Sequence, residues 1–115
     1  MSVTIWHNPK CSTSRKVLEA IRSHGIEPKI VLYVETPPSE QDIKAVLKDT
    51  GLSTRELLRR NGTPYDELGL DDPKFTDAKL VALMHKHPLL IQRPVVSTKK
   101  GTRLCRPPER VEEIL

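Results

Sequence analysis

The chain has 115 residues, of which 37% are hydrophobic and 30% charged, a balance typical of one globular domain and not of a disordered polymer. Its net charge of +4 could attract anions, but the basic residues occur in pairs without interleaved aromatics, which argues against nucleic-acid binding. Because no run approaches the ~18 apolar residues of a membrane helix and no signal peptide is recognisable, we expect no membrane association and a cytoplasmic location with reduced thiols.

The first third of the chain predicts a strand–helix–strand unit. Residues 3–6 are short, β-branched and aromatic, and predict a buried strand. A helix over residues 13–24 follows, with apolar residues at helical spacing and a stop at Gly25. Residues 29–34 are apolar without alternation, which favours a second strand buried on both faces. Such a unit places its two strands parallel.

The middle of the chain predicts helices joined by turns. Ser39, the Ser53-x-x-Glu56 capping box and Thr76 each mark a helix start, and residues 61–75 are rich in turn-forming residues. The last third predicts strands at 94–97 and 102–105 and a final helix from Pro107. The order is βαβ, a helical insert at about residues 36–90, then ββα. We therefore expect one α/β domain over residues 1–115, with a thioredoxin-like mixed sheet interrupted by the insert.

Cys11 is the main candidate for chemistry. It follows the first strand and precedes the first helix, where unpaired N–H groups and the helix dipole favour a thiolate and also bind anions. A buried structural cysteine is the alternative, which the polar neighbours argue against. In the C-x-x-S pattern Ser14 cannot form a disulfide, so turnover requires an external thiol, or Cys105 if it lies close. Ser14 is interpreted as a helix cap or an anion contact.

One histidine and several arginines are candidate partners for this thiol. His7 could act as a base or thiolate partner, or could simply orient the loop. Arg93 and Arg106 each precede a proline at the end of a predicted strand, and a planar guanidinium suits a tetrahedral oxyanion. Arginines elsewhere could join them, and only convergence on Cys11 would make any of them functional; these are Arg59, Arg60 and Arg103. No metal-ligand spacing or nucleotide-binding loop is present.

The segment from His7 to Arg15, His-Asn-Pro-Lys-Cys-Ser-Thr-Ser-Arg, resembles the active-site loop of glutaredoxin-linked arsenate reductases. Other segments resemble the same family, in order, across essentially the whole chain: Tyr33–Pro38, Arg55–Arg59, Pro64–Leu70, Ile91–Val96 and Gly101–Pro107. The resemblance implies a thioredoxin-like fold, a role in arsenical resistance, and reduction of arsenate to arsenite with glutathione and glutaredoxin as partners. It implies no bound cofactor, with glutathione as a co-substrate.

The resemblance also implies roles for individual residues. Cys11 would be the nucleophile, with His7 beside it favouring the thiolate and Ser14 touching the thiolate or the anion. Arg59, Arg93 and Arg106 would hold the oxyanion. The Arg93–Pro94 peptide bond would be cis.

Two other functions stay open at this stage. The chain ends before arsenate reductases of this type end, and shorter members of the family share the cysteine loop, so the substrate could differ from arsenate. One alternative is therefore a thiol oxidoreductase of the same fold acting on another substrate. The other is a non-enzymatic regulator or adaptor that binds a protein such as RNA polymerase, although the regulators of this superfamily carry a C-x-x-C switch that Ser14 removes.

Overall fold

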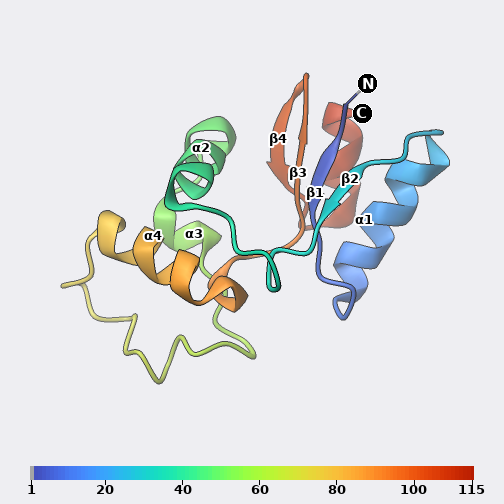
Figure 1. The fold of residues 1–115 in the computed structure, drawn as a ribbon. Coiled ribbons are helices and arrows are strands. Elements are labelled where there is room, and N and C mark those ends of the chain that lie inside the picture. The colour runs from blue at the N-terminus through green and yellow to red at the C-terminus, as the bar shows by residue number, and fades with distance from the viewer. Residues whose placement is uncertain (1) are drawn as a thin grey trace. The chain divides into compact units, whose positions relative to one another are not determined.

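A computed structural model describes residues 2–115, which form two compact units (Figure 1). The first unit comprises residues 2–36 and 93–115 and carries the sheet, whereas the second comprises residues 37–92 and is helical. The bounds of the second unit lie close to those predicted for the helical insert. Within residues 2–115, no helix is long and apolar enough to cross a membrane.

The first unit is built on a mixed sheet of four strands in the order β2-β1-β3-β4. The strands are β1 (Thr4–Trp6), β2 (Lys29–Val31), β3 (Val95–Thr98) and β4 (Gly101–Leu104). β1 runs parallel to β2 and antiparallel to β3, and β3 and β4 form an antiparallel hairpin. The predicted mixed sheet and its βαβ…ββα order are confirmed.

One row of paired residues crosses all four strands. Trp6 pairs with Val31 on one side and with Val95 on the other, and Val95 pairs with Leu104. β1, β2 and β4 end at this row, and β3 begins at it. The loops beyond the row therefore all leave the sheet at one edge, which is where α/β folds of this kind bind ligands.

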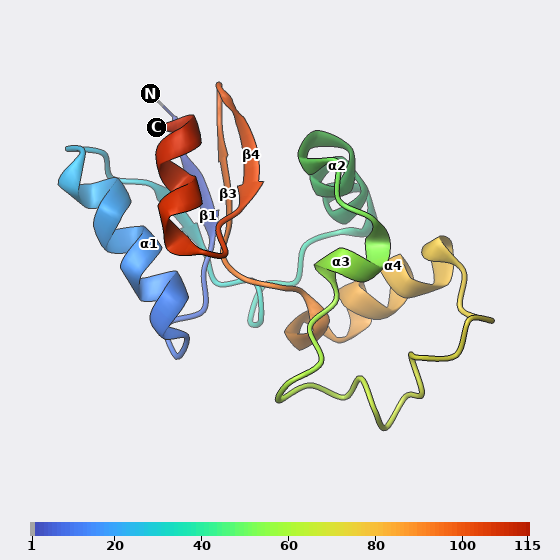
Figure 2. The same cartoon turned by 180° about the vertical axis from the view of Figure 1, so that it is seen from behind.

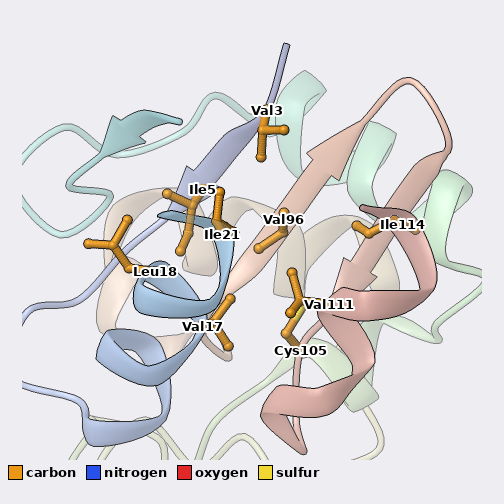
Figure 3. Packing of buried hydrophobic residues seen from close by; sticks show 9 residues of the cluster. All are labelled: Val3, Ile5, Val17, Leu18, Ile21, Val96, Cys105, Val111 and Ile114. Atoms are coloured by element: carbon orange, nitrogen blue, oxygen red, sulfur yellow. The ribbon is translucent and has the colours of Figure 1, made fainter. Parts of the chain in front are cut away.

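One face of the sheet is covered by α1 (Ser12–Ser23) and by the 3₁₀ helix η2 (Pro108–Ile114), which pack against each other (Figure 2). Ile5 and Val96 are partners in the sheet and point toward these two helices (Figure 3). The core of the unit consists of Val3, Ile5, Val17, Leu18, Ile21, Val96, Cys105, Val111 and Ile114. Each buried aliphatic side chain of this kind contributes about 1.5–3 kcal/mol, so the cluster holds α1 on the sheet.

The second unit consists of α2 (Glu40–Thr50), α3 (Thr54–Leu57), α4 (Asp77–Lys86) and the 3₁₀ helix η1 (Pro88–Leu90). The predicted N-caps of this unit are observed: Ser39 and Ser53 form capping boxes, and the Thr76 hydroxyl accepts the N–H of Lys79. In α1, by contrast, the N-cap is Cys11, and Ser14 lies within the helix and does not cap it. α2 ends at Gly51, whose φ of 74° is the left-handed conformation that glycine adopts without a steric penalty. α4 packs against both α2 and α3.

Two elements differ from the sequence predictions. The second strand ends at Val31 rather than at residue 34, because the carbonyl of Leu32 accepts the N–H groups of Glu35 and Thr36 and closes a turn. The final helix is 3₁₀ rather than α over all seven of its residues, Pro108–Ile114.

Candidate active site at the Cys11 loop

Cys11 lies at the N-cap of α1, at the sheet edge described above. Its N–H donates to the carbonyl of Asn8 (3.0 Å), and its carbonyl accepts the N–H of Arg15 (3.0 Å). The first bond closes a tight turn over Pro9 and Lys10, and the second begins the helix. Only 9% of Cys11 is exposed, so the sulfur is held at the helix N-terminus in a largely enclosed position.

Three neighbours stabilise the thiolate of Cys11. Burial alone raises the pKa of the thiol, but the backbone N–H of Ser14 and the guanidinium groups of Arg93 and Arg106 lower it by more. The pKa falls from 9.0 to about 7. About half of the Cys11 side chains are therefore thiolate at neutral pH, the form that acts as a nucleophile.

The two arginines reach Cys11 because of the sheet register. Arg93 lies two residues before Val95 and Arg106 two residues after Leu104, and these two strand residues are paired. Nη1 of Arg106 donates to the carbonyl of Arg93 (3.0 Å) and lies 3.9 Å from Sγ of Cys11. Both arginines precede cis prolines: the Arg93–Pro94 bond was predicted, whereas the Arg106–Pro107 bond was not.

Ion pairing separates these two arginines from others. Arg60 pairs with Asp66 (2.7 Å) and Asp71 (3.0 Å), and Arg103 pairs with Glu113 (3.0 Å). Their charges are satisfied locally by carboxylates. Over residues 2–115, none of the observed ion pairs includes Arg93 or Arg106. Two guanidinium groups without carboxylate partners beside a thiolate form a site suited to an oxyanion.

His7 and Ser14 stabilise the loop beneath the sulfur. Nδ1 of His7 lies 2.6 Å from Oγ of Ser14, and the N–H of Asn8 donates to the same oxygen (3.1 Å). All three residues are buried. Burial lowers the pKa of His7, and the charges of Arg22 and Arg15 lower it further, so the imidazole is neutral at pH 7. A neutral ring adds no positive charge to the thiol, so the geometry favours the loop-orienting role of His7 over the charge-supplying one.

A sequence profile described as the ArsC family matches residues 6–114. The chain belongs to the ArsC family. It is similar to an arsenate reductase from Escherichia coli, with 54% identity over 114 residues that cover 99% of this chain and 81% of that protein. It is also similar to the uncharacterized protein YfgD from Escherichia coli (strain K12), with 41% identity over 98% of this chain and 96% of that protein.

Solved structures show the same relationship. The structure of an arsenate reductase from Vibrio cholerae superimposes with a TM-score of 0.95 at 44% identity, covering 100% of this chain and 98% of that chain. These comparisons confirm the family inferred from the sequence segments and the thioredoxin-like fold predicted with it.

The second cysteine of this ArsC-family chain has a different environment. Cys105 is fully buried in the core beside Val111 (Figure 3), and its Sγ makes only a long contact of 3.7 Å with the carbonyl of Arg103. Burial raises its pKa to about 12. It is therefore protonated at neutral pH and unsuited to attack a disulfide or an arsenic–sulfur bond. No cluster of three His, Cys, Asp or Glu side chains that could hold a metal ion occurs in residues 2–115.

Arg59, the third arginine implied by the resemblance, lies in the second unit two residues after the end of α3. Its N–H donates to the carbonyl of Leu90 (2.7 Å), and its carbonyl accepts the hydroxyl of Thr63 (2.8 Å). The side chain is half-buried. Its assignment to the oxyanion site stays a prediction.

Sequence reasoning missed two residues of this edge. Asn8 is buried, and its Oδ1 accepts the N–H of Lys10 (3.0 Å), which shapes the turn that presents Cys11. An asparagine directly before a proline in a short loop is a signal that could have found it. Tyr33 was assigned to a strand because it lies in an apolar run, but it belongs to the turn after β2.

Proposed function

We propose that this protein is an arsenate reductase in which the Cys11 thiolate attacks an arsenate held by arginine side chains. The observation that carries the proposal is a thiol with a pKa of about 7 beside Arg93 and Arg106, which lack carboxylate partners among the described residues. The 54% identity to an arsenate reductase supports arsenate as the substrate. Arg59 would be the third arginine, as the resemblance implies.

In the first step, the sulfur of Cys11 bonds to arsenic and one arsenic–oxygen bond breaks. The departing oxygen leaves as water after protonation, which yields a Cys11 thiol–arsenate ester with arsenic still pentavalent. Negative charge builds up on the arsenate oxygens as the sulfur approaches. Arg93 and Arg106 offset that charge, and fixed positive groups at such a position are a major source of rate enhancement.

Reduction of arsenic needs two electrons, and Cys11 cannot supply them alone. Cys105 is buried and protonated, and position 14 is serine, so an external thiol must complete the reaction. Glutathione fits this role: its thiolate attacks Sγ of Cys11, a disulfide forms, and the electron pair of the sulfur–arsenic bond stays with arsenic, which leaves as arsenite. A glutaredoxin thiolate then takes the glutathione from Cys11 and regenerates the thiolate.

His7 and Ser14 would act by holding the loop. The His7–Ser14 hydrogen bond joins the loop to the first turn of α1, where the N–H of Ser14 stabilises the sulfur. Because both the enzyme and its reductants require free thiols, we place the activity in the cytoplasm.

The test is NADPH consumption in the presence of glutathione, glutaredoxin and glutathione reductase, with and without arsenate. We expect arsenate-dependent consumption that is lost in Cys11→Ser and retained in Cys105→Ala. Arg93→Gln should lose most of the arsenate-dependent rate, whereas the matched variant Arg103→Gln should keep it.

Other results would point to the alternative functions. Consumption with a glutathionylated protein and no response to arsenate would indicate a thiol oxidoreductase with a different substrate. A folded protein with an alkylatable Cys11 but no consumption under either condition would contradict an enzymatic role and favour an adaptor.

A further inference from the structure

The mechanism above leaves the buried side chain of Tyr33 without a role. Tyr33 is fully buried in the turn that follows β2, and the side chains of Asn8 and Arg93 lie near its hydroxyl. In the described part of the chain, however, no contact of this hydroxyl has the geometry of a hydrogen bond. A hydroxyl removed from water normally finds a protein partner, and an unpaired one destabilises the folded state. The unpaired hydroxyl of Tyr33 therefore needs a physical reason, and the position of Tyr33 at the edge of the sheet suggests one.

Tyr33 lies at the same distance along the chain from the paired strand residues as the arginines of the site do. The row of paired residues across the sheet is Val31, Trp6, Val95 and Leu104. Two residues beyond this row, at the same edge, stand Tyr33, Asn8, Arg93 and Arg106. The pairing continues past the strands, since the N–H of His7 donates to the carbonyl of Val31 (2.9 Å) and that of Cys105 to the carbonyl of Pro94 (3.0 Å).

The electrostatic surroundings of Tyr33 agree with this placement. Burial raises the pKa of Tyr33, and this is the largest effect. The charge of Arg93 and the nearby polar side chains of Asn8 and Arg93 lower the pKa, whereas the Cys11 thiolate raises it. The tyrosine hydroxyl is thus close enough to Cys11 and Arg93 for both to change its pKa. Because its pKa is raised overall, it keeps its proton at neutral pH and can donate a hydrogen bond.

A second unpaired donor lies beside it. Nε of Arg93 is buried and has no hydrogen-bond partner within residues 2–115. The nearby Cys11 sulfur is a weak acceptor, so an oxygen-bearing anion would be a better partner for both donors. Arg93 as a residue is half-buried, which leaves its guanidinium some freedom to move and admit such an anion.

We propose that the Tyr33 hydroxyl is a ligand of the oxyanion, donating a hydrogen bond to an oxygen of the same anion that Arg93 binds. This inference rests on the proposed function, because it requires an oxyanion beside Cys11. It assigns Tyr33 to substrate binding and gives the buried hydroxyl its partner in the bound state.

The experiment compares wild type with Tyr33→Phe, using sodium arsenate and sodium sulfate as probes. Protection of Cys11 from iodoacetamide at increasing anion concentration gives an apparent Kd. We expect Tyr33→Phe to raise that Kd about tenfold, the loss expected for one hydrogen bond to a charged group, without lowering the melting temperature. Tyr65→Phe is the matched control, since its hydroxyl donates to Asp71 (2.8 Å) in the second unit, and its Kd should equal that of wild type.

A spectroscopic measurement tests the role of Tyr33 without replacing it. The chain contains two tyrosines, so Tyr65→Phe leaves Tyr33 as the only one. With tyrosine labelled by ¹³C at Cζ, saturating arsenate should shift the single remaining signal, because the hydroxyl gains an acceptor.

The outcomes separate this inference from the function on which it rests. If wild-type Cys11 is protected by arsenate but Tyr33→Phe has the same Kd, or the labelled signal does not move, the role of Tyr33 is overturned and the arginine site stands. A Tyr33→Phe variant whose Cys11 pKa changes without any anion would also overturn it, because that would show an effect on the thiol itself. If neither anion protects wild-type Cys11, the oxyanion site and the role of Tyr33 fail together.

Discussion

Replacement of Arg93 by glutamine should raise the pKa of Cys11 by a measurable amount. The pKa of Cys11 is about 7, two units below the ordinary 9.0, although burial acts in the opposite direction. Two units correspond to about 2.7 kcal/mol of preference for the thiolate. Arg93 contributes both a hydrogen bond and a charge, so we expect its loss to return about one unit and to place the pKa near ~8.

The expected change in reactivity follows from the thiolate fraction. At pH 7 the fraction falls from about one half to about one tenth, so alkylation by iodoacetamide should be about five times slower in Arg93→Gln. Above pH 9 the two proteins should react at similar rates, because both are then fully ionised. The assay is the rate of alkylation from pH 5 to 10, followed by mass spectrometry, in which the buried Cys105 stays unmodified.

The control is Arg103→Gln, which removes an equal charge from an arginine that pairs with Glu113. Its profile for Cys11 should match that of wild type. A wild-type midpoint near pH 9, or an unchanged midpoint in Arg93→Gln, would refute the argument that the arginines activate the thiol.

Three further predictions concern stability. Because the pKa of Cys11 is lower in the folded protein than in the unfolded chain, the unfolded state binds more protons between pH 7 and 9. In urea titrations, wild type should therefore gain about 2 kcal/mol over Cys11→Ser as the pH rises through that range. Cys105→Ser should lower the free energy of unfolding by about 1–3 kcal/mol, because it places a hydroxyl in a fully buried position, while leaving the alkylation rate of Cys11 unchanged. Ser53→Ala removes the capping box of α3 and should cost about 1 kcal/mol, visible as a lower melting temperature.

Helix starts in the second unit could be predicted because their signals are local. Ser39, Ser53 and Thr76 each accept a backbone N–H from the residue three positions later. Such a bond depends on the sequence of one turn and not on the rest of the fold. The same applies to Gly51, whose left-handed conformation ends α2.

The C-terminal end of β2 could not be predicted, because a side chain can be buried either within a sheet or at a binding site beside it. The apolar run of residues 29–34 was interpreted as a single strand, yet the chain turns after Val31. Tyr33 is buried all the same, but at the edge of the sheet and beside charged groups. Hydrophobicity favours burial without ensuring it, since Val34 of the same run is 38% exposed. It also does not show whether a sheet or a binding site buries a residue.

Which arginines lie at Cys11 and which pair with carboxylates also depends on tertiary structure. Arg60 and Arg103 have carboxylate partners, while Arg93 and Arg106 meet at Cys11, and nothing in the residue type distinguishes the two groups. The strand register brings Arg106 to a cysteine far from it in sequence. Sequence reasoning named the cysteine loop and the proline-flanked arginines, but their convergence required the structure.

The long sequence separation within the site has a consequence for the newly synthesised chain. Cys11 emerges from the ribosome well before Arg93 and Arg106, which follow it by 82 and 95 residues in the chain. Until β3 and β4 join the sheet, the thiol lacks these arginines and has the ordinary pKa of an exposed cysteine. At neutral pH it is then mostly protonated and slow to react with oxidants or electrophiles. Completion of folding is thus the event that activates the nucleophile, and the unfinished chain is protected from its own reactivity.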